Sequence, residues 1–282
     1  MRTSSNPAFR NLPRSAAGTP YAGFDQPYGQ PGYGAPAGYG APMGYGAPRT
    51  SSDAATRPMT VDDVVMKTGA SLGVTLLAGV ITAIWAQAQV AAGSMGAITG
   101  AMIGGLLVGL VLSLIITFKQ VANAPMTLAY AAAEGVFLGA LTGVFELVYP
   151  GIALQAILGS AAVFVVMLVV YKTGAVKVTP KFRKWMIGAL GGVAIVMLVN
   201  LVLALFGINT GLRDGSGLAI VFSLVVIGIA AFSFLLDFDM ADEAIRQGVP
   251  AKFAWYVAFG LLVTLVWLYL EILRLLSYLQ QD

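Results

Sequence analysis

Four carboxylates stand close together near the end of the sixth long apolar stretch of this chain. The run reads Phe232-Ser-Phe-Leu-Leu-Asp237-Phe-Asp239-Met-Ala-Asp242-Glu243, in a chain that holds only 13 acidic residues. Hydrocarbon cannot solvate a charged carboxylate, so such groups persist where they pair, reach water or bind an ion or a proton. These acids are therefore the first candidates for proton or cation chemistry.

The four acids do not share one helix face. Asp237 and Asp239 are two residues apart, so on a helix their side chains point about 200° apart and cannot line one site together. Asp242 and Glu243 fall beyond the expected hydrocarbon edge, where Arg246 can pair with them at a solvated helix end. Asp237 lies on a face of small residues that suits close helix packing. Asp239 is the leading candidate for an ion or proton site.

Two further acids lie inside apolar stretches. Glu134 is in the middle of the third stretch and has no basic residue one helical turn away. It must therefore be protonated, bonded across helices or next to a wet cavity. Glu271 is three residues before Arg274, which favours a local ion pair near the opposite membrane surface.

Depth along the helices indicates which of these groups can meet. Asp239 precedes the turn at residues 248–250 by about ten residues, or roughly 15 Å of helix at 1.5 Å per residue. On the returning last helix the same depth falls near Gly260 to Thr264, and Glu271 lies roughly 10 Å further out. Glu134 has a compatible depth in the third stretch. We therefore expect Glu134 to be the better candidate partner of Asp239.

The composition defines the environment of these acids. The chain is 58% hydrophobic and 10% charged, with a mean hydropathy of +0.82, whereas a soluble domain carries about a quarter charged residues. Cys and His are both absent, which removes disulfides, thiolate nucleophiles and Cys/His metal or haem sites. We expect a membrane protein without resident cofactors, without enzymatic activity and without nucleic-acid partners, since its basic residues lie at membrane edges.

Seven apolar stretches have the length of about 20 residues that crosses a bilayer. They run near 64–86, 97–118, 125–148, 152–171, 185–206, 217–240 and 253–279. Thr60, followed by acids in the first turn, predicts the start of the first helix. Glycines four residues apart, as in Gly139/Gly143 and Gly188/Gly192, indicate close packing of helices in the bundle. The sequence thus predicts an all-α membrane protein with seven transmembrane helices.

The basic residues predict the orientation of these spans. Only Arg213 and Arg274 fall on one side of the predicted membrane. The other side collects Arg57, Lys67, Lys119, Lys172, Lys177, Lys181, Arg183, Lys184, Arg246 and Lys252. Because Lys and Arg concentrate in cytoplasmic loops, we expect a cytoplasmic N-terminus and a C-terminus outside.

Residues 1–60 form a separate compositional unit. The run Gly-Tyr-Gly-Ala-Pro occurs three times at intervals of six residues, ending at Pro36, Pro42 and Pro48. Such a density of Gly and Pro cannot build a core, so we expect a disordered cytoplasmic tail. Residues 61–282 then form the seven-helix transmembrane domain.

Several short motifs resemble those of the Bax inhibitor-1 family, the transmembrane Bax inhibitor motif proteins. Phe232-Ser233 is followed at the family's distance by the aromatic–acid pair Phe238-Asp239. The third span contains the run Gly135-Val-Phe-Leu-Gly139, and the last contains a Leu-Tyr-Leu-acid run that ends at Glu271. The likeness extends from about residue 60 to the end, and the repeat-bearing tail is not part of it.

This resemblance implies a central seventh helix surrounded by the other six, in a bacterial cell membrane. It also implies a pH-sensitive calcium leak in which an Asp of the sixth helix pairs with an Asp of the seventh. Asp239 matches the first position and would be the calcium contact. The Leu-Tyr-Leu-acid run places Glu271 at the second position, whereas the distance from the end of the helix places Thr264 there. The depth estimate favours Thr264, which cannot titrate.

Two functions are consistent with these features. In the first, calcium or protons pass through the bundle, with Asp239 as the gate and Glu134 as a local partner. In the second, the protein conducts nothing and regulates other membrane proteins or a quality-control protease. The tail and the small-residue helix faces would then be its binding surfaces.

Overall fold

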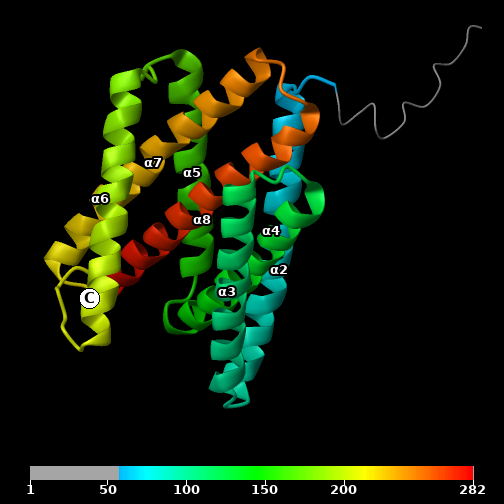
Figure 1. Cartoon of the computed structure of the whole chain (residues 1–282). Helices are drawn as coiled ribbons and strands as arrows, with labels where there is room; N and C mark the ends of the chain where they lie inside the picture. The colour runs from blue at the N-terminus through cyan, green and yellow to red at the C-terminus, as the bar shows by residue number, and fades with distance from the viewer. Residues whose placement is uncertain (1–56, 282) are drawn as a thin grey trace, which may run out of the picture. The chain divides into compact units, whose positions relative to one another are not determined.

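The computed structural model describes residues 57–281, and within them the chain forms seven long helices (Figure 1). Each is long and apolar enough to cross a membrane. The helices are α2 (Val61–Ala91), α3 (Met95–Lys119), α4 (Ala124–Val148), α5 (Ile152–Thr173), α6 (Pro180–Leu205), α7 (Gly217–Arg246) and α8 (Ala254–Leu279), with a short 3-10 turn η2 (Ala251–Phe253) before α8. This confirms the all-α fold with seven membrane-length helices. The predicted disordered tail lies outside the described residues, except for residues 57–60.

Local sequence signals begin and end these helices. The predicted start of the first helix at Thr60 is confirmed, and Thr60 and Asp63 form a capping box there. Asn123 and Thr179 each cap a helix that has proline in its first turn, where the missing N–H costs nothing. Short connections between the helices make consecutive helices antiparallel, so the chain alternates between two ends of the bundle. We call the end with residues 57–60 and the α7–α8 turn the basic end, and the other the opposite end.

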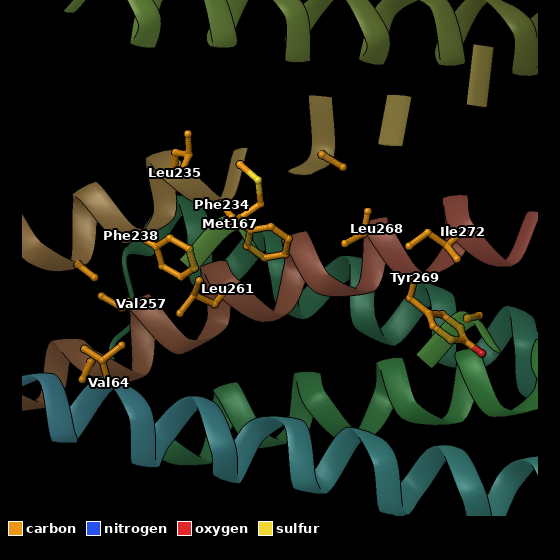
Figure 2. Close-up of a cluster of buried hydrophobic side chains, with 14 of the residues drawn as sticks. Val64, Met167, Phe234, Leu235, Phe238, Val257, Leu261, Leu268, Tyr269 and Ile272 are labelled. Atoms are coloured by element: carbon orange, nitrogen blue, oxygen red, sulfur yellow. The ribbon is translucent and has the colours of Figure 1, made fainter. Parts of the chain in front are cut away.

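The last helix, α8, is the most buried of the seven. It packs against α2, α4, α5 and α7, while α3 packs chiefly on α4 and α6 on α7. In Figure 1 it runs obliquely between α7 and α2. Figure 2 shows Phe234 and Phe238 of α7 beside Leu261 of α8, in a core of buried hydrophobic side chains. The last helix is therefore central, as expected, but four helices and not all six pack chiefly against it. Any group on α8 is held from several sides.

Glycines bring α2 and α4 into close contact. A Cβ atom on Gly135 would lie 2.5 Å from the carbonyl oxygen of Thr75, and one on Gly139 would overlap the carbonyl oxygen of Gly79. Gly143 similarly faces the backbone of Ala83. The four-residue glycine spacing thus serves bundle packing at this contact, as predicted. The glycines of α6 differ, because a Cβ on Gly188 or Gly192 would meet nothing within 4 Å.

Candidate functional site

Asp237 joins α7 to the central helix. The Thr264 hydroxyl on α8 donates a hydrogen bond of 2.7 Å to Asp237 Oδ2. The same hydroxyl lies 3.3 Å from the Gly260 carbonyl oxygen of its own helix. Asp237 is half-buried and stands nine residues before the end of α7 at Arg246, which is about 13 Å of helix. The depth estimate therefore found the right turn of α8, but it assigned that turn to the wrong aspartate.

Asp239 points toward a different helix. Its Oδ2 lies 2.7 Å from Arg183 Nη2 on α6, and its side chain is 19% exposed. The prediction that Asp237 and Asp239 cannot line one site is confirmed by their different partners. The partner of Asp239 is thus a basic residue and not the acid Glu134 that the depth estimate favoured. Arg183 had already been placed at the same end by the distribution of basic residues, and that signal could have identified the pair.

Glu134 does not meet Asp239. It is buried on α4, where its Oε1 would lie 3.0 Å from a Cβ placed on Gly109 of α3. No salt bridge to Glu134 occurs among residues 57–281. The proposed Glu134–Asp239 pair is therefore wrong. Depth gives only the position along the helix axis, whereas the partner depends on which helices adjoin and how each is rotated.

The remaining acids at the end of α7 behave as predicted. Arg246 lies 3.5 Å from Asp242 and 3.0 Å from Glu243, and all three side chains are about half-exposed. Such exposed pairs contribute little to stability because water and salt screen them. They form a solvated helix end and not a second site.

Glu271 belongs to a separate cluster at the opposite end. Its Oε1 lies 2.8 Å from Arg274 Nη1, which confirms the predicted local pair, and 3.6 Å from Arg213 Nη2. The carboxylate is 3% exposed, and its Oε2 is buried without a hydrogen-bond partner among the described residues. Because Glu271 is seven residues beyond Thr264, or about 10 Å along α8, it is not the partner of either aspartate on α7.

Asp237 also lines a pocket at the basic end of the bundle. The pocket has a volume of about 450 Å³ and lies between α6, α7 and the α7–α8 turn. Its lining residues are Arg183, Ile187, Leu236, Asp237, Met240, Glu243, Ala244, Gln247, Val249 and Phe253. A carboxylate that bonds to the central helix is thus reached from an open space that also contains a guanidinium group. Sequence reasoning missed this pocket, because its walls come from distant segments.

A second pocket, of about 650 Å³, lies at the opposite end between α6 and the loop that follows it. Arg213 and Asp214 of that loop line it, together with Asn200 and Asn209. Burial lowers the pKa of Arg213, and the positive charge of Arg274 adds to this effect. Hydrogen bonding from Ser216 lowers the pKa of Asp214. The contact of Arg213 with Glu271 joins this loop to α8.

The described side chains offer too few ligands for a resident calcium ion. Among the described residues no group of three or more acids lies close enough to hold a metal ion. Calcium takes six to eight oxygen ligands, whereas Asp239 offers one carboxylate that is already paired with Arg183. The donor set of these residues therefore does not fit a resident calcium ion.

Seven membrane-length helices among the described residues, of which the last is the most buried, define a multi-pass helical membrane protein. The comparison with protein families is more specific, since residues 6–281 match the family model described as Bax inhibitor 1 like. The chain belongs to this family. The match begins at residue 6, so the likeness extends further than the segment from about residue 60 on which the motifs were found. No curated protein and no solved structure matches the chain.

Proposed function

We propose that this protein is a pH-sensitive cation leak, with calcium as the transported ion, gated at the contact between Asp237 and Thr264. The observation that carries this proposal is a carboxylate that lines an open pocket and bonds to the central helix. Membership of the Bax inhibitor 1 like family is consistent with it. The proposed gate is thus Asp237. It lies two residues before the Asp239 that the motif alone suggested, on a different face of α7.

The gate would close because two bonds hold α7 in place. Asp237 ties α7 to α8 through Thr264, and Asp239 ties α7 to α6 through Arg183. A carboxylate in its ionised form makes charge-assisted bonds, which are about twice as strong as neutral ones. A proton on Asp237 would therefore weaken its tie to Thr264, and a passing cation would compete with Thr264 or Arg183 for the carboxylate oxygens. Acid pH and cations would both act on the tie at Asp237.

Replacing Thr264 with valine tests the gate directly. Valine keeps the shape of threonine but cannot donate to Asp237, so α7 loses its polar tie to α8. A hydrogen bond to a charged group contributes about 1.5–3 kcal/mol, so we expect calcium flux into proteoliposomes at neutral pH to rise about tenfold or more. The matched control is Thr173→Val, because the exposed Thr173 hydroxyl bonds only to carbonyls of its own helix. Equal flux in both variants would argue against Thr264 as part of a gate.

The second candidate function is a non-conducting regulator that binds other membrane proteins or a membrane protease. One observation favours it: α6 is the least buried of the seven helices and packs chiefly on α7. Its glycines at 188, 191 and 192 have no neighbour within 4 Å of a Cβ position, so another helix could approach closely there. A protein of this kind would show no flux that depends on Asp237 or Thr264, so the flux experiments separate the two functions.

A further inference from the structure

Residues Arg57–Thr60, which we call the strap, are paired with the α7–α8 turn. The Met59 N–H donates to the Val249 carbonyl at 2.8 Å, and the Ala251 N–H donates to the Arg57 carbonyl at 2.7 Å. These two bonds enclose an antiparallel bridge between Pro58 and Pro250. Both prolines occupy positions whose own N–H groups would point away from the partner segment, so no bond between the segments is lost by using proline.

Side chains fix the strap to the first helix as well. The two terminal guanidinium nitrogens of Arg57, Nη1 and Nη2, each donate to the Asp63 carboxylate at 2.7 Å. The same carboxylate accepts from the backbone and the hydroxyl of Thr60. Met59 is 2% exposed and belongs to the main hydrophobic core. The strap is therefore held by backbone bonds, a bidentate ion pair and apolar burial together.

The α7–α8 turn, held on one side by the strap, forms a wall of the Asp237 pocket on the other. Gln247, Val249 and Phe253 of the turn line that pocket. Val249 carries both roles, because its carbonyl accepts from Met59 while the residue contributes to the pocket wall. Lys67 of α2 adds a further bond from its ammonium group to the Ala251 carbonyl. Moving the strap would therefore move or loosen this wall.

We infer that the strap is a mechanical link that holds the α7–α8 turn in place and so keeps this wall of the Asp237 pocket closed. Release of the strap would break the two backbone bonds and free the turn. The pocket would then open more often to solutes from the basic end. Only the consequence for ion flux rests on the proposed function, because the link itself can be tested without any flux.

The absence of cysteine in the chain provides a clean reporter. Met240 lines the pocket and is half-buried, so Met240→Cys in the full chain reports access by its rate of reaction with a charged thiol reagent. Replacing Arg57 with alanine removes the bidentate pair that anchors the strap. We expect the labelling rate to rise about tenfold, the factor equivalent to about 1.4 kcal/mol. The control reporter Ala204→Cys, in the pocket at the opposite end, should keep its rate.

A disulfide that locks the strap shows whether faster labelling comes from release of the turn or from a general loss of structure. Residues facing each other between such bonds have Cα atoms about 4.5 Å apart, within the range that a disulfide spans. Pro58→Cys with Pro250→Cys should therefore join under oxidation and return Met240→Cys labelling in the Arg57→Ala chain to the rate seen with Arg57.

Two results would overturn the link: a labelling rate that Arg57→Ala leaves unchanged, or a raised rate that persists in the locked chain. Labelling that follows the strap while flux ignores Asp237 would support the link and refute the proposed leak. The failure of one proposal is thus distinguishable from the failure of the other.

Discussion

Gly139→Ala should unfold at a clearly lower temperature than the unaltered protein. The added Cβ would overlap the Gly79 carbonyl oxygen and lie 2.9 Å from the Gly79 Cα. These are backbone atoms in the middle of α2, which cannot rotate away as a side chain can. Relief requires α2 and α4 to separate, and overpacking of this kind costs about 1–3 kcal/mol or more. Thermal unfolding in detergent, followed by tryptophan fluorescence, measures the loss.

Gly188→Ala is the matched control for this contact. It makes the same chemical change inside a membrane-length helix, but the new methyl group meets nothing within 4 Å. Alanine also favours helix over glycine by about 0.5–1 kcal/mol. We expect unchanged or slightly raised stability. Equal losses in the two variants would mean that the α2–α4 contact is not as close as described.

Glu271→Gln should also destabilise the protein strongly. The carboxylate is 3% exposed and lies against Arg274 and Arg213. Glutamine keeps the shape but removes the negative charge that lies against two guanidinium groups, one of which is already partly desolvated in the loop. Breaking a buried pair costs about 3–5 kcal/mol, and the partial exposure of both arginines reduces the expected loss to about 2–3 kcal/mol.

The same thermal measurement on Glu243→Gln provides the comparison for Glu271. Glu243 pairs with Arg246 three residues away, just as Glu271 pairs with Arg274, but its side chain is 51% exposed. Its replacement should therefore lower the unfolding temperature much less than Glu271→Gln does, because water and salt screen an exposed pair. If the two variants lose equal stability, burial does not decide the strength of these pairs.

Local sequence was sufficient for the helices and for some of the polar contacts. Apolar length predicted the seven membrane helices, the capping residue type predicted the start of α2 at Thr60, and three-residue spacing predicted the Glu271–Arg274 pair. Each of these depends on residues close in the chain. The separate faces of Asp237 and Asp239 also followed from helical geometry alone. In each case the information lies within one or two helical turns.

Contacts between helices required more than depth. The partner of Asp239 is Arg183 and not Glu134, because α7 lies beside α6 at this end while Glu134 faces α3. Thr264 was found at the right depth but belongs to Asp237. Helix rotation and adjacency decide these pairs, and neither is encoded in the spacing of residues within one segment.

The strap was missed for a similar reason. Pro58 of the strap and its partner Pro250 are separated in sequence by six of the seven long helices, and each was assigned to an irregular segment or turn on composition alone. Residues 57–60 were counted with the tail because they precede the first helix. Their backbone bonds to the α7–α8 turn come from the packing of α2 beside the start of α8.

The most direct test of the proposed leak is calcium flux into proteoliposomes for the unaltered protein and Asp237→Asn, each at an acidic and at a neutral pH. Asparagine can still accept from Thr264 but carries no charge and does not titrate. We predict flux that changes with pH in the unaltered protein and flux that is equal at both pH values in Asp237→Asn. An Asp237→Asn protein with the same flux and the same pH response as the unaltered one would contradict the proposal that Asp237 gates the bundle.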